Sequence, residues 1–463
     1  MRCALAFFLA GLPVLAAEPD WTRIDSETLR HFQALVRMDT CDPPGNEEPA
    51  VAYLKRVLEA EGIPVRIFTK EPKRPNLVAR LKGSGARRPV LVMGHTDTVN
   101  VDPAKWTRHG PFSAGLEGGY IYGRGTVDDK DNLVASLMTI LLLKRLNATL
   151  DRDVIFLAEA AEEGRSEIGA GFMAAGHWPE LDAEFCLAEG GGASREGGRL
   201  VAVNITTTEK LPARATLIVR GTAGHGSVPL PDNAIARLSR AVAKAAAWQT
   251  PMRMNDTSRA YFERLATVST PEQAARYNGL LNPERASEIQ EWLRLNEPRH
   301  YSMLRTSISP TIFQSGYRMN VIPSEAQATL DIRAAPGEDL DAFFAELRRQ
   351  IGDDQVEVRP IRPDRAITDP SRIDTEMFRA LEAMQKKHYP GAITLPAVLT
   401  GATDMAYLRA KGMQCYGVGP LTEAEDAQKG YGAHSDQERI LETELYRFVR
   451  FHYEAVAEVA RKR

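Results

Sequence analysis

Five residues that can bind a metal or move a proton follow three short apolar segments of this 463-residue chain. "LVMGHTDTV" carries His95 and Asp97 directly after an apolar run, and "VIFLAEAAEEG" leads into Glu162 and Glu163. "FCLAEGGG" leads in the same way into Glu189. Positions two apart in a strand point to the same side, so the spacing predicts that His95 and Asp97 act together at a strand end.

Two further motifs add metal-binding residue types. "GRGTVDDK" places Asp128 and Asp129 just before a helix predicted from about 130 to 146, and "YGAHSDQER" places His434 before the last amphipathic helix. Carboxylates gathered in one place repel one another unless cations neutralise them. Imidazole and carboxylate donors without thiolate suit Zn²⁺, with Co²⁺ or Mn²⁺ as substitutes. The number of donors favours two ions that share a bridging carboxylate and activate a water.

Each motif alone also has an ordinary explanation. His95 by itself resembles a surface or core histidine, and the Glu162–Glu163 pair resembles solvated loop acids. The Asp128–Asp129 pair has the composition of a helix N-cap and its neighbour. The order of the motifs and their placement at strand ends favour the metal site over these separate explanations.

Short, continuously apolar strands alternate with helices along the chain. Strands are predicted at 65–68, 76–81, 90–93 and 154–158, and the first helix is predicted to begin at Ser26 as its N-cap. This alternation is typical of the α/β class, with a sheet covered by helices on both faces. In such sheets the ligand site lies beyond the carboxyl ends of the strands, which is where the motifs fall.

Length and charge limit the remaining classes. A chain of 463 residues is expected to form at least two domains. The net charge is only −3 and no block of Lys and Arg stands out, so we expect neither nucleic acid nor a membrane as a partner.

Residues 1–17 have the pattern of a cleavable secretory signal. A positively charged start, an apolar run and two small residues precede a polar segment, and the run is too short to span a bilayer. The alternatives are an uncleaved anchor and a chance apolar start. The pattern predicts an exported protein, periplasmic or secreted. The three cysteines beyond this segment, an odd number at wide spacing, argue against a disulfide framework.

"GHTDTV", "GRGTVDDK", "AEEG", "AEGG" and "GAHSDQE", in this order, resemble the motifs of the M20 metallopeptidase family. That family of dinuclear zinc enzymes includes glutamate carboxypeptidase, carboxypeptidase S-like enzymes, aminoacylase-1, succinyl-diaminopimelate desuccinylase and carnosinase. The resemblance implies a zinc-exopeptidase-type catalytic domain with a mixed sheet, and a smaller inserted α/β lid through which the protein forms a homodimer. The expected boundaries are 1–17 for the signal, 18–208 and 364–463 for the catalytic domain, and 209–363 for the lid.

The resemblance also implies the parts that the site residues play. It implies five metal ligands. His95 and Glu189 would bind one ion, His434 and Glu163 would bind the other, and Asp128 would bridge the two ions. A cis peptide bond is expected between Asp128 and Asp129. Asp97 would orient His95. Glu162 would be the general base, taking a proton from the attacking water and delivering one to the leaving amine.

Three lid residues match substrate contacts of the family. His225 in "GHGS" would help to stabilise the oxyanion, often from the partner subunit, and Asn320 in "NVIP" would be a polar contact. Arg333 in "DIR" would bind the terminal carboxylate of the substrate, a task suited to the planar guanidinium, although an ordinary strand-end arginine is the alternative. Asp404 in "TGATDM" aligns with a loop near the substrate. Residues 250–305 have helical character and are interpreted as an elaboration of the lid with no assigned chemistry.

These inferences predict a metal-dependent hydrolase of an amide bond next to a free carboxylate, acting on small peptides or N-acyl amino acids. In the family, glutamate at the position of Glu189 is associated with carboxypeptidases and acylases, whereas aspartate is associated with aminopeptidases and dipeptidases. The sequence therefore favours a carboxypeptidase or an N-acyl-amino-acid hydrolase. The alternatives are a dipeptidase and a non-catalytic binding protein on the same scaffold.

Overall fold

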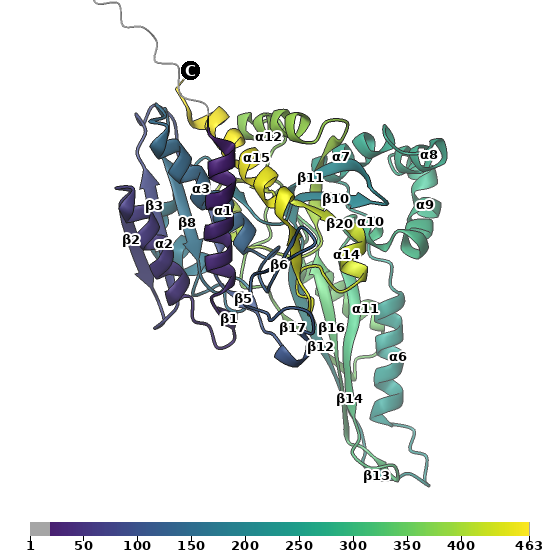
Figure 1. Cartoon of the computed structure of the whole chain (residues 1–463). Helices are drawn as coiled ribbons and strands as arrows, with labels where there is room; N and C mark the ends of the chain where they lie inside the picture. The colour runs from purple at the N-terminus through teal and green to yellow at the C-terminus, as the bar shows by residue number, and fades with distance from the viewer. Residues whose placement is uncertain (1–18, 463) are drawn as a thin grey trace, which may run out of the picture.

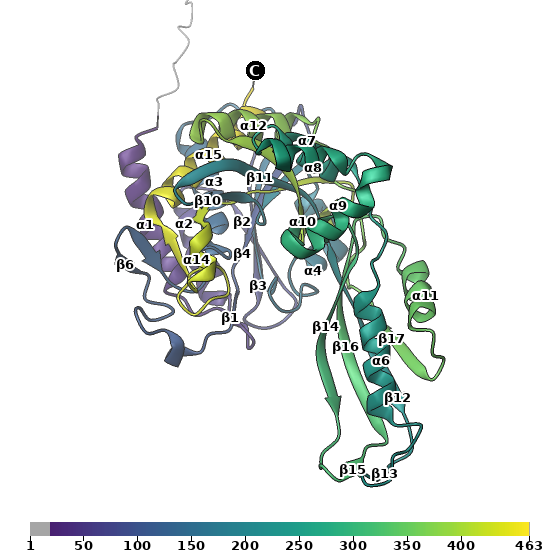
Figure 2. The same ribbon diagram turned by 90° about the vertical axis from the view of Figure 1, so that its right-hand side faces the viewer.

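A large helix-covered sheet and a smaller sheet that projects from it make up the chain (Figures 1 and 2). The computed structural model describes residues 19–462, so the predicted signal at 1–17 lies outside the described residues. Within 19–462, no helix has both the length and the apolar character needed to cross a membrane. The α/β class predicted from the sequence is confirmed.

The large sheet is mixed. Its strand order is β2 (Val65–Thr69), β3 (Pro75–Leu81), β8 (Val154–Glu159), β4 (Val90–His95), β9 (Phe185–Ala188), β19 (Gln414–Gly417), β11 (Arg199–Glu209), β10 (Gly192–Glu196) and β20 (Leu421–Glu423), with β18 (Ile393–Leu399) also paired to β11. The central strand β4 runs parallel to both β8 and β9. All six residues of β4 are buried, as its continuous apolar run predicted.

Helices cover both faces of the large sheet. Alternate residues of β4 belong to two different apolar clusters, Val90 and Val92 to one and Leu91 and Met93 to the other. The first face carries α1 (Trp21–Val36), α2 (Glu48–Ala60), α3 (Lys130–Arg145), α12 (Glu376–His388) and α15 (Glu442–Ala460), and the second carries α4 (Ala170–Gly176), α5 (Trp178–Leu181) and α13 (Met405–Arg409). The sheet is therefore the middle layer of three.

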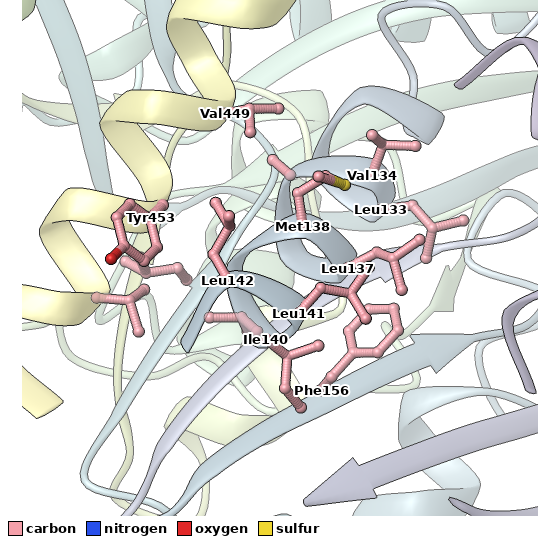
Figure 3. Packing of buried hydrophobic residues seen from close by; sticks show 14 of the residues in the cluster. Leu133, Val134, Leu137, Met138, Ile140, Leu141, Leu142, Phe156, Val449 and Tyr453 are labelled. Carbon is pink, nitrogen blue, oxygen red and sulfur yellow. The ribbon is translucent and has the colours of Figure 1, made fainter. Parts of the chain in front are cut away.

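Helix α3 lies between the sheet and α15. Figure 3 shows Leu137 and Leu141 beside Phe156 of β8, and the upper side of α3 facing Val449 and Tyr453 of α15. A helix that is apolar nearly all round is expected to be buried, and α3 is buried from Lys130 to Leu143. This burial fixes the start of α3, which directly follows Asp128 and Asp129.

The first helix begins earlier than predicted. Helix α1 starts at Trp21, where the Asp20 carboxylate accepts a hydrogen bond from the Arg23 N–H. Ser26 lies inside the helix and its hydroxyl donates to the Thr22 carbonyl. The predicted start at Ser26 is wrong because Asp20 is an equally good cap residue one and a half turns earlier.

The smaller sheet, with the two helices on it, is called the lid below. Its strand order is β14 (Ser307–Ser315), β16 (Glu325–Ala334), β12 (Leu211–Arg220) and β17 (Val356–Ile361), and its helices are α6 (Ala234–Ala247) and α11 (Leu340–Ile351). Apolar residues that alternate along β12 and β16 pack against both helices. A short pair, β13 (Gly224–His225) and β15 (Val321–Ile322), forms the tip of the lid (Figure 2).

Four helices between α6 and β14 do not belong to the lid. They are α7 (Asp256–Ala266), α8 (Pro271–Gly279), α9 (Pro283–Asn296) and α10 (Pro298–Met303). Their apolar side chains, including Phe262 and Leu293, form one cluster with Leu395 and Val398 of β18 in the large sheet. The interpretation of 250–305 as an elaboration of the lid is therefore wrong. These helices lie between two lid elements in the sequence, but they pack against the large sheet.

Small elements complete the site end of the large sheet. They are the parallel pair β1 (Cys41–Asp42) and β5 (Thr98–Val99), the strands β6 (Gly115–Glu117), β7 (Tyr120–Tyr122) and β21 (Arg439–Leu441), a 3-10 turn at Pro103–Lys105, and α14 (Ala424–Gln428). The three cysteines of the described residues are buried and unpaired, as expected without a disulfide framework.

Candidate metal centre

The candidate metal centre lies where three strands of the large sheet end. Strand β4 ends at His95, opposite Glu159 at the end of β8, and Glu189 directly follows β9. Gly94 allows α3 to approach this edge, since a Cβ atom there would lie 2.7 Å from the Leu133 nitrogen. Parallel packing thus brings side chains from distant segments to one edge of the sheet.

One carboxylate lies between the two histidines. The Nε2 atom of His95 is 3.1 Å from Oδ1 of Asp128, and Nε2 of His434 is 2.9 Å from Oδ2 of the same residue. The same His434 nitrogen is 2.9 Å from Oε1 of Glu163. The two imidazole rings therefore meet opposite oxygens of one aspartate.

The donors form two overlapping groups. His95, Glu162 and Glu189 bring one ligand atom each within 4.8 Å of one another, and so do His95, Asp128 and Glu163. Imidazole and carboxylate donors without thiolate are the set expected for Zn²⁺ and similar divalent ions. The residues present fit a site for metal ions.

The charges at this edge also fit bound cations. Burial and the nearby Asp404 raise the pKa of Glu162 well above its usual value, and burial and Glu162 do the same to the pKa of Glu189. Hydrogen bonds with Asp128 and Glu163 raise the pKa of His434 to about 10. Buried acids with raised pKa values lose their protons more readily when a positive charge lies nearby. Bound divalent ions would supply that charge.

Asp97 connects the two halves of the cluster. Its buried carboxylate accepts hydrogen bonds from the backbone N–H groups of Glu162, at 3.2 Å, and Glu163, at 3.0 Å. Nδ1 of His95 lies 3.0 Å from the Asp97 carbonyl, which can only accept, so this ring nitrogen carries the proton and Nε2 faces Asp128. Asp97 thus positions both His95 and the two glutamates.

The backbone has uncommon conformations around the cluster. The peptide bond between Asp128 and Asp129 is cis. Ala161, directly before Glu162, and His434 both have left-handed backbone, with φ of 64° and 62°. Left-handed backbone at residues other than glycine costs on the order of 1–3 kcal/mol per residue and concentrates at functional sites.

The helix-cap explanation of the aspartate pair is not supported. Asp129 precedes α3 but makes no side-chain cap hydrogen bond. Its carboxylate instead accepts from the His95 backbone N–H and from the Asn132 side chain. Asp129 therefore ties the start of α3 to the end of β4.

Two buried ion pairs that support the cluster were missed in the sequence. Glu438 lies 2.6 Å from Arg124 and also accepts from the Val127 N–H, next to Asp128. Glu438 stands four residues after His434 in the same motif, a signal that could have identified it. Arg365 lies 3.2 Å from Asp404, and no motif marks it in the sequence.

The three lid residues with predicted substrate contacts lie apart. His225 and Asn320 are together at the exposed tip, where the Gly226 N–H donates to the Asn320 carbonyl, away from the large sheet (Figure 2). Arg333 lies at the other end of β16, with its Nε 3.1 Å from Asp331. One chain therefore does not bring these residues to one place.

A cavity of about 500 Å³ opens beside Asp128 and Glu189. Segments 190–192 and 418–420 form one wall, where the backbones touch: a Cβ atom on Gly191 would lie 2.1 Å from the Gly417 carbonyl oxygen. The volume is within the range of small-molecule sites, roughly 300–1,000 Å³.

Known proteins with similar sequences and folds point to one family. The profile of Peptidase family M20/M25/M40 matches residues 91–458. The probable carboxypeptidase S-like 2 of Dictyostelium discoideum is 27% identical over 82% of this chain and 74% of its own, and the human N-fatty-acyl-amino acid synthase/hydrolase PM20D1 is 27% identical over 75% and 70%. The crystal structure of an M20 family metallo-carboxypeptidase from Sulfolobus solfataricus shares the fold, with a TM-score of 0.67 at 21% identity and coverage of 94% and 99%. The chain belongs to the M20 peptidase family.

Proposed function

We propose that the chain is a metal-dependent amidohydrolase that binds two Zn²⁺ ions, with Co²⁺ or Mn²⁺ as possible substitutes. The proposed ligands are His95, Asp128, Glu163, Glu189 and His434. The observation that carries the proposal is the Asp128 carboxylate, whose two oxygens face the imidazoles of His95 and His434. A carboxylate in this position is suited to bridge two ions.

Glu162 is the proposed general base. It lies within the donor group of His95 and Glu189, and Asp97 holds its backbone. When bound, the ions polarise the scissile carbonyl and lower the pKa of the attacking water. Glu162 takes the proton from that water and delivers it to the leaving amine. Asp97 orients the two glutamates and His95 for this step.

The proposed substrates are small peptides or N-acyl amino acids with a free carboxylate next to the scissile amide. The likeness to a carboxypeptidase S-like protein and to an N-fatty-acyl-amino acid synthase/hydrolase supports this substrate class. Arg333 is the proposed partner of the carboxylate, because its guanidinium is partly exposed at the base of the lid. Glu189 rather than aspartate favours carboxypeptidase or acylase activity over dipeptidase activity.

We further propose a homodimer formed through the lid. Strand β14 is at the edge of the lid sheet and exposes Ile312 and Phe313, and Tyr317 and Met319 are exposed near the tip. Edge strands with exposed apolar side chains favour pairing with another chain. A partner lid would supply His225 and Asn320 to a site that these residues do not reach within their own chain.

The function is tested by metal analysis and a substrate panel. The purified protein is loaded with Zn²⁺, its metal content is measured, and hydrolysis of N-acyl amino acids and dipeptides is compared with that of their C-terminal amides. We expect two ions per chain, and turnover of the free acids that chelation abolishes. Two bound ions without turnover of any panel member would instead favour a binding protein on this scaffold.

Export is a separate proposal based on the composition of residues 1–17. Expression of the full chain in a bacterium, followed by mass analysis of the periplasmic protein, tests it. We expect a mature chain that lacks the signal, whereas recovery of the intact chain from the cytoplasm alone would contradict export.

A further inference from the structure

The helices α7 to α10 contribute a charged residue to the cavity beside the metal centre. Arg299 of α10 lines this cavity together with Asp128 and Glu189. These helices are docked on the large sheet through the cluster that includes Phe262 and Leu395, and α10 is also held by Lys210, which donates to Ser302. A residue far from every family motif thus shares a cavity with two of the proposed metal ligands.

The Arg299 guanidinium has no carboxylate partner. Its side chain is exposed, and among residues 19–462 no acidic group lies within ion-pair distance of it. Glu423, which also lines the cavity, is already 2.9 Å from Arg195. A positive group is therefore available at the cavity wall for an anion.

The backbone under Arg299 is held firmly. The next residue, His300, lies 2.5 Å from Glu297 through Nδ1 and 3.1 Å from the Tyr261 hydroxyl through Nε2. The rings of Tyr261, Phe262 and Tyr277 surround His300 at centroid distances of 5.3–5.6 Å. Because His300 is fixed on the inner side of α10, the backbone of Arg299 is also held in place and its side chain extends outward.

Several buried polar atoms of the cavity lining lack a partner within the described residues, among them Oδ1 of Asn132 and both carboxylate oxygens of Asp131. The Oδ1 atom of Asn204 is buried and, within the described residues, accepts no hydrogen bond. Buried acceptors normally have a donor, so this atom suits an N–H group of a bound molecule. Among the described residues of the lining, Arg299 is the one basic side chain, beside the acids Asp128, Asp131, Glu189 and Glu423, so a negative group of a ligand is favoured at Arg299 and donor groups elsewhere.

We propose that Arg299 binds a second carboxylate of the substrate, one that is not next to the scissile amide. This inference rests on the proposed function and narrows its substrate class to N-acyl amino acids or dipeptides with two negative charges. The planar guanidinium binds carboxylates through two parallel hydrogen bonds, which lysine does not reproduce. The second carboxylate belongs either to the acyl group or to the amino acid side chain, and both sources have the same chemistry.

Two pairs of substrates test the proposal. N-succinyl-leucine is compared with N-succinamoyl-leucine, and N-acetyl-glutamate with N-acetyl-glutamine, so that each pair differs only in one charge. In Arg299→Ala we expect kcat/KM for the acidic member of one pair to fall about 10- to 100-fold, mainly through KM, with little change for its neutral partner. The pair that responds identifies which end of the substrate carries the second carboxylate.

Two further variants serve as controls. Arg299→Lys keeps the charge but cannot donate two parallel hydrogen bonds, so it should recover only part of the lost kcat/KM for the acidic member. Arg294→Ala removes another exposed arginine of these helices, one that pairs with Glu291 outside the cavity, and should leave all four substrates unaffected. Equal losses for acidic and neutral members, or no preference of the unaltered enzyme for either acidic member, would overturn the proposal.

Binding measurements separate this inference from the proposed function. Calorimetry of the same four compounds uses zinc-loaded Glu162→Gln protein with and without Arg299→Ala. Weaker binding of an acidic member alone supports the role of Arg299 even if no turnover is ever found. Turnover that is present, with Arg299→Ala changing the acidic and neutral members equally or not at all, contradicts the role of Arg299 and leaves the proposed hydrolase function intact.

Discussion

The metal centre and the tip of the lid differ in how completely a single chain assembles them. In the centre, Asp128 contacts His95 and His434, and every proposed ligand comes from the same chain. At the tip, His225 is exposed, and its Nδ1 atom forms hydrogen bonds with the hydroxyl and the backbone N–H of Ser227. The proposed chemistry is therefore built into one sheet edge, whereas His225 lies apart from that edge within its own chain.

The difference follows from the supporting structure. His95 ends a strand that is packed between two helical layers, and Glu163 and Glu189 follow such strands, whereas Asp128 and His434 lie in turns. Lys210 is the single residue between β11 of the large sheet and β12 of the lid, and residues 248–255, 304–306 and 362–375 also connect the lid to the rest of the chain. Preorganised groups suit proton transfer, whereas the smaller projecting lid offers an exposed surface to a substrate or a second chain.

Glu162→Gln should abolish most turnover without loss of metal. The amide cannot accept the proton from water, and removal of a general base lowers kcat by about 10²–10⁴-fold. Metal content measured by mass spectrometry should stay at two ions per chain. Glu167→Gln, a change in an exposed loop acid of the same segment, is the matched control. A variant with undiminished kcat would exclude Glu162 as the base.

His225→Ala should lower kcat by about 10²-fold, the loss expected for one oxyanion donor, again with both ions bound. If the histidine acts from the partner subunit, mixing this variant with Glu162→Gln restores activity, because the mixed dimer has one site with both residues. Random exchange of subunits would recover about a quarter of the unaltered activity. Failure of the mixture to gain activity would mean that His225 acts within its own chain, which requires closure of the lid.

Arg333→Ala should raise KM for substrates with a free terminal carboxylate by roughly 10-fold, since a hydrogen bond to a charged group contributes about 1.5–3 kcal/mol. Hydrolysis of the matching C-terminal amides should change little. Arg214→Ala, on the neighbouring strand β12, is a control because Arg214 also lies near Asp331, at 3.7 Å. Equal effects on acids and amides would assign Arg333 a structural part in the lid.

The sequence predicted the centre better than its surroundings. His95, Glu162, Glu163 and Glu189 were identifiable because buried strands read as apolar runs, and the residues that end such strands must meet at one edge. Helix α3, Lys130–Arg145, lies within its predicted range because its apolar run is long and uninterrupted. These features could be predicted because each depends on a pattern of apolar residues within one short segment.

Features that depend on docking could not be predicted in the same way. The helices α7 to α10 have ordinary amphipathic patterns, and nothing in them indicates that Phe262 would pack against β18 rather than against the lid. Arg299 carries no motif, so only its position at the cavity marks it. The pairing of Arg365 with Asp404 likewise joins residues without any shared pattern. Tertiary contacts between distant segments decide all three.

The smallest expected effect concerns Lys210, which lies between the large sheet and the lid, and the pH dependence of the free energy of unfolding. Burial, with Arg333 and Arg305 nearby and only partly offset by Asp331, lowers the pKa of Lys210 to about 7. Its ammonium donates to neutral oxygens of Ser302 and Ser307 and has no carboxylate contact among the described residues.

Between pH 7 and the ordinary lysine pKa of about 10.4, the unfolded chain holds a proton on Lys210 that the folded chain has released. The free energy of unfolding should therefore rise with pH in this window, by up to about 1.4 kcal/mol per pH unit, and the contribution should disappear in Lys210→Met. Urea unfolding at pH 7.5 and 8.5 of both proteins measures the difference in slope. Identical slopes in the two proteins would show that Lys210 keeps its proton in the folded chain. The contacts between the large sheet and the lid at Lys210 would then be stronger than its neutral partners indicate.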